Sequence, residues 1–223
     1  MADATPLTIR HPDAPPVGGV VVVQEAFGIT DHIEGVCQRL ADVGWLAVAP
    51  HLFHRTGDPV LPYDDFSQVT PHFSALTREG ILADVDAALD FIVDAGFPVD
   101  TAGIVGFCMG GMYALKAAGT GRFTRAASFY GMARVPAMWQ GPTQGEPLDA
   151  LAAPGACPAI EIAGTSDPWL PAEDMAALEA AGVEVVRYEG ADHGFVHDPS
   201  RPAHRAADAA DAWSRVLTHL AGD

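Results

Sequence analysis

Short apolar segments alternate along the chain with longer segments in which apolar residues recur every three or four positions. The apolar segments span residues 17–24, 45–49, 102–105, 126–131, 158–164 and 183–188. Segments of this length with little polar alternation are typical of parallel strands that are buried on both faces. One further segment, residues 7–10, precedes a proline-rich stretch, which favours a short strand at the edge of a sheet.

The longer segments carry the periodicity of amphipathic helices. Stripes of apolar residues lie within 31–44, 81–96, 171–182 and 206–220, and residues 112–118 also have a helical pattern. Asp31 and Glu34 predict a capping box at the start of the first of these helices, which we expect to end at Gly44. Residues 50–70 and 132–156 have little periodicity, so we expect irregular loops there and no large lid domain.

Strands that alternate with helices are typical of an α/β fold with a doubly wound, mostly parallel sheet flanked by helices. No repeat, linker or low-complexity segment interrupts the alternation. We therefore expect one α/β domain over residues 1–223. Its functional site should lie at the carboxyl edge of the sheet, because open α/β sheets bind their ligands there.

The segment GFCMGG, residues 106–111, places Cys108 between an apolar segment and a helical one. A G-x-nucleophile-x-G turn of this kind lifts the nucleophile of an α/β-hydrolase into the cleft, because glycines on both sides permit the strained backbone. The helix N-terminus favours a thiolate, and the Met109 amide can face an oxyanion. By itself the pattern also fits a buried structural cysteine beside a tight turn.

An acid and a histidine follow Cys108 in the order that such a turn requires. Asp167 comes directly after the segment 158–164, and His193 lies in the loop after the next apolar segment. Taken singly, Asp167 fits a residue that caps a turn, and His193 fits a polar loop residue. Three residues in the required order, each just beyond its own predicted strand, favour a Cys-Asp-His triad.

Four segments resemble the dienelactone hydrolase family, which has the α/β-hydrolase fold. They are VVQEAFG at 22–28, the GFCMGG turn, SDP at 166–168 followed by Pro171, and DHGF at 192–195, and together they extend over almost the whole chain. The resemblance implies a cysteine nucleophile in place of the usual serine. It also implies a glutamate beside the thiol, here Glu25, although the position of Glu25 after a buried strand fits a structural ion pair with an arginine equally well.

On this resemblance we expect hydrolysis of a small ester or lactone through a thioester, with the Met109 and Ala26 amides as the oxyanion hole. The family's best-known members hold a substrate carboxylate with arginines and with a serine after the catalytic histidine. This chain has Gly194 in place of that serine and His197 near one arginine position, so the sequence does not identify the substrate. The candidate pocket residues are Arg55, Trp169, Phe195 and His197.

The charge of the chain limits the classes of molecule that it can bind, and its cysteine content indicates the cellular compartment. With 12 basic and 29 acidic residues the formal net charge is −17, so nucleic acid and anionic membranes would be repelled. The three cysteines form no disulfide framework and the first residues lack a basic, apolar leader, so we expect a cytoplasmic protein. His51 and His54 lack a third metal ligand of suitable spacing. We expect a small-molecule substrate, no cofactor or metal, and a monomer or small homo-oligomer.

A noncatalytic thiol redox sensor, or a small-ligand-binding protein on the same fold, is the alternative function. An exposed cysteine of low pKa is oxidised by peroxide to sulfenic acid. Neither Cys37 nor Cys157 has a position that suggests a resolving thiol, however, and a sensor needs neither Asp167 nor His193. The residue pattern therefore favours a hydrolase.

Overall fold

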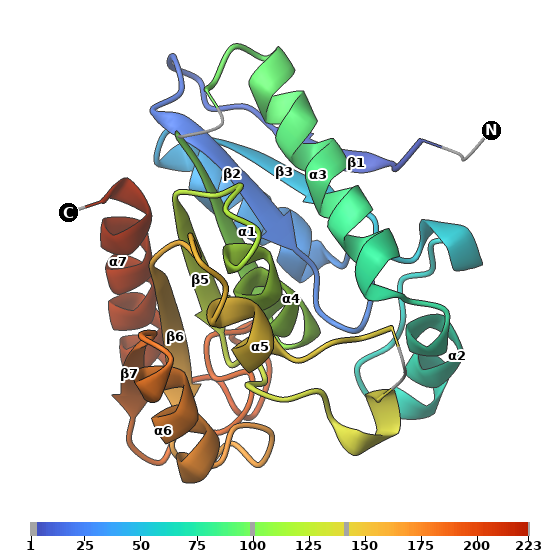
Figure 1. Ribbon diagram of the computed structural model, residues 1–223, viewed down its shortest axis with the longest axis vertical. Helices are drawn as coiled ribbons and strands as arrows, with labels where there is room; N and C mark the ends of the chain where they lie inside the picture. Colours follow the sequence, from blue (N-terminus) through green and yellow to red (C-terminus); the bar gives the residue numbers. More distant parts are fainter. Residues whose placement is uncertain (1–3, 99–100, 141–142, 223) are drawn as a thin grey trace.

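The fold is built on one seven-stranded sheet, and the computed structural model describes residues 4–98, 101–140 and 143–222. The strands are β1 (Leu7–Arg10), β2 (Gly18–Val23), β3 (Trp45–Pro50), β4 (Ala102–Phe107), β5 (Arg125–Phe129), β6 (Ala159–Gly164) and β7 (Glu184–Tyr188). They lie in the order β1-β3-β2-β4-β5-β6-β7 (Figure 1). β1 pairs antiparallel with β3, and the other neighbouring pairs are parallel. The predictions of a mostly parallel sheet and of a short edge strand at 7–10 are confirmed.

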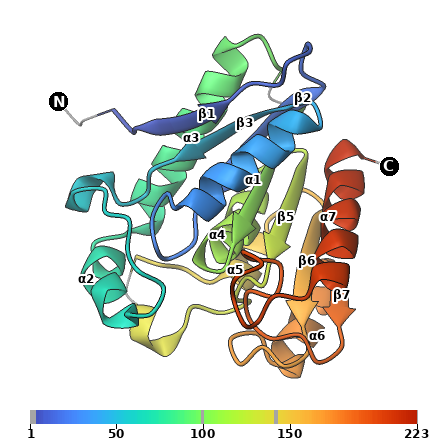
Figure 2. The ribbon, with the colours of Figure 1, turned by 180° about the vertical axis from the view of Figure 1, so that it is seen from behind.

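Helices cover both faces of this sheet. They are α1 (Asp31–Asp42), α2 (Val69–Ser74), α3 (Arg78–Asp94), α4 (Met109–Ala118), α5 (Pro147–Leu151), α6 (Ala172–Ala180) and α7 (Ala206–Ala221). α1 and α7 lie on one face, and α3, α4 and α6 lie on the other (Figures 1 and 2). The chain therefore has the doubly wound α/β-hydrolase architecture that the alternation of patterns predicted.

The interior strand β2 shows why the apolar segments become buried strands. All six of its residues are buried. Successive side chains of a strand point to opposite faces, so Val20 and Val22 pack in the layer of α1 and α7, while Val21 and Val23 pack in the layer of α3 and α4. A strand that is apolar at every position can bury both of its faces only between two such layers.

The start of α1 differs from the predicted capping box. The N-cap is Thr30, whose hydroxyl accepts a hydrogen bond from the Ile33 amide at 3.4 Å. Glu34 instead pairs with the Arg10 guanidinium on β1, with 2.9 Å between Arg10 Nη2 and Glu34 Oε2. The predicted capping box at Asp31 and Glu34 is therefore wrong: Thr30 caps the helix one residue earlier, so Glu34 lies beyond the N3 position, and its carboxylate pairs with a cation from a distant segment.

The two segments predicted as irregular loops contain short helical pieces. Residues 50–70 include the 3₁₀ turns His54–Thr56 and Phe66–Gln68 and the first residues of α2, and residues 132–156 include the 3₁₀ turn Ala137–Trp139 and α5. Helices of five or six residues are too short to show a periodic apolar stripe. In the described parts of both segments, which leave out residues 141–142, no large lid rises from the sheet, as expected (Figure 1). None of the described helices combines the length and the apolar composition that a membrane crossing requires.

Candidate active site

Cys108 lies at the sharp turn between β4 and α4, as the GFCMGG pattern predicted. Its backbone has φ 54 and ψ −117. This conformation is strained, and so unfavourable in free energy, for any residue other than glycine. The flanking glycines are required by close backbone approach. A Cβ on Gly106 would lie 2.0 Å from the Gly110 carbonyl oxygen, and one on Gly110 would lie 2.2 Å from the Val23 carbonyl oxygen. The turn therefore holds a partly exposed thiol at the N-terminus of α4.

Asp167 and His193 meet at the same edge of the sheet, beyond β6 and β7. The distance between His193 Nδ1 and Asp167 Oδ2 is 2.7 Å, and the other carboxylate oxygen of Asp167 accepts a hydrogen bond from the Trp169 amide at 2.8 Å. The Asp167 side chain is fully buried, whereas the His193 side chain is 23% exposed. Because Nδ1 faces the carboxylate, Asp167 orients the imidazole and leaves its Nε2 available for proton transfer.

The electrostatic surroundings favour a protonated His193. Burial by itself would lower the pKa of His193, but the negative charge that a Cys108 thiolate carries and hydrogen bonds to Asp167 and Cys108 outweigh it and raise the pKa to about 10. The other two cysteines are in different surroundings, since burial raises the pKa of Cys37 to about 12 and that of Cys157 to about 11. Cys108 is therefore among the groups that influence the pKa of His193, together with Asp167.

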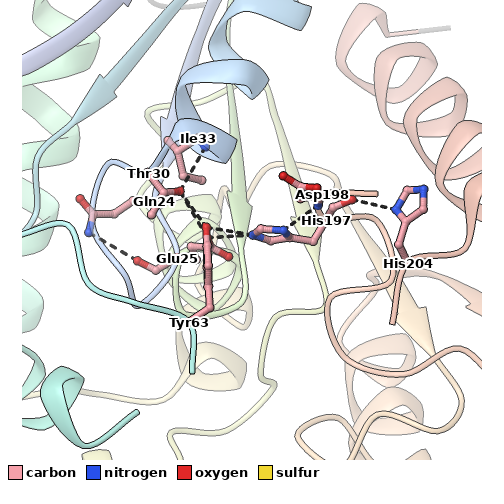
Figure 3. A network of polar contacts seen from close by, with 8 residues as sticks. All are labelled: Gln24, Glu25, Thr30, Ile33, Tyr63, His197, Asp198 and His204. Carbon is pink, nitrogen blue, oxygen red and sulfur yellow. Dashed lines mark hydrogen bonds and ion pairs between the residues drawn. The ribbon is translucent and has the colours of Figure 1, made fainter. Parts of the chain in front are cut away.

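Glu25 follows β2 and is the centre of a buried polar network (Figure 3). Its Oε1 atom accepts hydrogen bonds from the Tyr63 hydroxyl, from Thr30 Oγ1 at 3.5 Å and from His197 Nε2 at 3.0 Å. Burial would raise the pKa of Glu25, but the hydrogen bond and charge of His197, followed by His32 and Tyr63, lower it, so the group is ionised at neutral pH. In the described part of the chain no hydrogen bond joins Glu25 to Cys108, and none reaches Glu25 Oε2.

His197 is held as a hydrogen-bond donor to Glu25. The Asp198 amide donates to His197 Nδ1 at 2.6 Å, so the ring proton lies on Nε2, which faces the carboxylate (Figure 3). The His32 ring stacks on His197 with 3.7 Å between centroids and 21° between planes. Sequence reasoning placed His197 among the pocket residues, and the structure shows its contact with Glu25. Tyr63 lies in the segment 50–70, which the sequence predicts only as an irregular loop, and no local pattern indicates that it reaches Glu25.

Of the three remaining pocket candidates, one lies beside Asp167 and two do not line the site. Trp169 is partly buried beside Asp167 and stacks on Trp139 at 6.0 Å between ring centroids. Arg55 makes a bidentate salt bridge with the buried Asp84, at 2.7 and 2.9 Å, and among the described residues it makes no hydrogen bond or salt bridge to another candidate. Phe195 is fully buried in the core and contacts Tyr188 and Tyr130, so it does not line an open pocket.

Met109 and Ala26 are the candidates for an oxyanion hole, and in the described part of the chain both backbone amides lack a backbone partner of the usual kind. Met109 is the first residue of α4, a position at which helix geometry leaves the amide without an intrahelical partner. Ala26 follows Glu25, and within the described residues its amide donates no hydrogen bond. No group of three or more His, Cys, Asp or Glu side chains in the described ranges is arranged to hold a metal ion.

Comparisons with known proteins show which family the chain resembles. The model of the "Dienelactone hydrolase family" matches residues 7–222. The "Putative carboxymethylenebutenolidase" of Escherichia coli strain K12 is 35% identical over 213 residues, which cover 91% of this chain and 76% of that protein. A "Probable 2-oxo-3-(5-oxofuran-2-ylidene)propanoate lactonase" of Bradyrhizobium sp. is 30% identical over 210 residues, covering 90% of this chain and 82% of that protein.

Among solved structures, the "Putative Dienelactone Hydrolase" of Klebsiella pneumoniae superposes with a TM-score of 0.87 at 30% identity, covering 98% of this chain and 93% of that one. Both the family match and the relatives extend over nearly the whole chain, from β1 to α7. The strand order, the strained turn at Cys108 and these similarities lead to one conclusion: the chain belongs to the dienelactone hydrolase family of α/β-hydrolase enzymes.

Proposed function

We propose that the protein hydrolyses small esters or lactones with a Cys108-Asp167-His193 triad, through a thioester acyl-enzyme. The observation that carries the proposal is the 2.7 Å hydrogen bond between Asp167 and His193, beside a thiol on a strained strand-to-helix turn. A redox sensor would not need that acid and histidine. The Bradyrhizobium relative is named a lactonase, which supports including lactones among the substrates.

Acylation begins with the transfer of the thiol proton to Glu25. Glu25 Oε2 is the acceptor, because the three hydrogen bonds to this side chain all end on Oε1. The thiolate attacks the carbonyl carbon, and the Met109 and Ala26 amides stabilise the oxyanion. Protonated His193 gives its proton to the ester oxygen as the C–O bond breaks. In a lactone that oxygen stays attached to the acyl chain.

Deacylation uses the same groups in the opposite sense. The now neutral His193 takes a proton from water, and the resulting hydroxide attacks the thioester carbonyl. The C–S bond breaks, and the Cys108 sulfur regains its proton from Glu25. A thiolate is a good leaving group, so an ester or lactone with a stable leaving oxygen suits this site better than an amide, whose amine leaves poorly.

The test is turnover of activated aryl esters and lactones by wild type, Cys108→Ala and Cys157→Ala. We expect Cys108→Ala to abolish turnover and Cys157→Ala to retain it, because Cys157 is remote from His193 and burial raises its pKa. Mass spectrometry of wild type quenched during turnover should find the acyl group on Cys108. Unchanged turnover in Cys108→Ala would rule out the proposed nucleophile.

A further inference from the structure

Tyr130 directly follows β5 at the edge of the sheet where the site lies. Its φ is 43, and the only other described residues with a side chain and a positive φ are Asp58 and Cys108. The two strained residues at this edge are neighbours, since the Cys108 amide donates to the carbonyl of Phe129 at 2.9 Å. Strained conformations persist where the surrounding structure holds them, and they concentrate at functional sites.

Hydrogen bonds on both sides of Tyr130 hold it in this conformation. Its amide donates to the Ile162 carbonyl at 2.8 Å, and the amide of Gly131 donates to Glu161 Oε1 at 3.0 Å. The ring packs edge-on against His193, with 5.0 Å between centroids and 63° between planes. The side chain therefore lies at the triad, in a position fixed by β6.

The Tyr130 hydroxyl differs from those of the other three tyrosines. Tyr63 donates to Glu25, Tyr113 to Gln144 and Tyr188 to Asp211. Tyr130 is 1% exposed, yet its hydroxyl has no hydrogen-bond partner among the described residues. Burying an unpaired hydroxyl costs free energy, so a hydroxyl retained in this state calls for a functional explanation.

The groups around Tyr130 indicate which of them its hydroxyl can bond. Burial raises the pKa of Tyr130 well above its usual value, and the negative charge of Glu25, together with that of a Cys108 thiolate, raises it further. The phenol therefore keeps its proton at neutral pH. A neutral O–H group can donate a hydrogen bond to an anionic neighbour, and the two candidates are Glu25 and the ionised Cys108. Glu25 already accepts three hydrogen bonds, whereas Cys108 becomes anionic during the reaction.

We propose that Tyr130 is a catalytic residue of this hydrolase, whose hydroxyl donates a hydrogen bond to the Cys108 sulfur when the thiol is ionised. This inference rests on the proposed function. The phenol keeps its proton, and the thiol proton goes to Glu25 as described above. A neutral thiol is a weak acceptor, so the bond forms with the thiolate before attack and again as the sulfur leaves the acyl group. Such a bond stabilises the charged states more than the resting enzyme, which is what accelerates a reaction.

The test compares Tyr130→Phe with Tyr188→Phe as a matched control. Both changes remove one hydroxyl from a buried tyrosine that packs against Phe195. Two quantities are measured: the rate of Cys108 alkylation by iodoacetamide as a function of pH, followed by peptide mass spectrometry, and kcat for an aryl ester. For Tyr130→Phe we expect the apparent thiol pKa to rise by about one unit and kcat to fall roughly tenfold or more, the scale of a hydrogen bond to a charged group.

For the control variant Tyr188→Phe we expect a change in stability and no change in the reactivity of Cys108. Tyr188→Phe should lower the thermal unfolding temperature, because it removes the bond to Asp211, and should leave the alkylation profile unchanged. Tyr130→Phe should unfold at the wild-type temperature or above, since it loses no protein partner. An alkylation profile and kcat within twofold of wild type, or a loss of stability as large as that of Tyr188→Phe, would overturn the inference. Turnover by Cys108→Ala would instead refute the triad itself.

Discussion

Replacement of Glu25 by glutamine separates the two effects that this carboxylate should have on Cys108. The glutamine side chain has nearly the same shape, and its carbonyl oxygen can still accept from Tyr63 and His197, so the side chain should keep its place. The substitution removes the negative charge near the thiol, and it puts an NH₂ group where the free Oε2 was. The mutant therefore loses both a source of repulsion and the proposed proton acceptor.

These two losses act in opposite directions on two measurable rates. A negative charge near a thiol raises the thiol pKa, so free Cys108 in Glu25→Gln should alkylate with iodoacetamide at least as fast as in wild type at neutral pH. Ester turnover should fall, because a general base contributes about 10²–10⁴-fold to a rate. We take about tenfold as the lower limit of the loss, which corresponds to about 1.4 kcal/mol in the activation free energy.

Glu161→Gln is the matched control for this experiment. Glu161 is also a fully buried glutamate at this edge of the sheet, but burial raises its pKa well above the usual value, so it is neutral. Glutamine imitates a neutral carboxyl group and should leave alkylation and turnover near the wild-type values. Glu25 is the opposite case, because its pKa is lowered by its hydrogen bonds despite burial. Equal turnover in Glu25→Gln and wild type would show that Glu25 is not the proton acceptor and has only a structural role.

Two further predictions concern the acid and the histidine. If Asp167 and His193 act as one unit, the double alanine variant should be scarcely slower than His193→Ala, and losses that multiply fully would mean that the two residues act independently. Burial lowers the pKa of His193, but the charge of a Cys108 thiolate and the bonds to Asp167 and Cys108 raise it to about 10. The proton-donating form should therefore persist at neutral pH, kcat/KM should decline only at alkaline pH, and Asp167→Asn should move that decline to lower pH. An alkaline limb that is the same in wild type and Asp167→Asn would contradict this reasoning.

The sequence alone determined the order of the strands along the chain and the turn that carries Cys108. Both depend on interactions between residues that are close together in the sequence. A segment apolar at every position needs apolar layers on both faces, as β2 has. A G-x-C-x-G turn needs glycines where the backbones approach closely, and the contacts of Gly106 and Gly110 show that requirement. The positions of Asp167 and His193 beyond their strands followed from the same patterns.

The sequence did not predict the short helices, because they are too short to show a periodic pattern. α2 and α5 have six and five residues, too few for an apolar stripe to distinguish a helix from a loop. The capping box predicted at the start of α1 was consistent with local propensity, yet Glu34 pairs with Arg10 on another strand. Competition from a distant charge cannot be read from a short window of sequence.

The partners of the charged and polar side chains were decided by the tertiary structure. Arg55 is bound to Asp84, 29 residues away, and Glu25 accepts from His197, 172 residues away. The unpaired hydroxyl of Tyr130 is recognisable only once the surrounding side chains have been placed. Periodicity places a residue on a strand or in a loop, but a hydrogen bond forms within about 3 Å. At that distance, the packing of segments far apart in the sequence decides which groups meet.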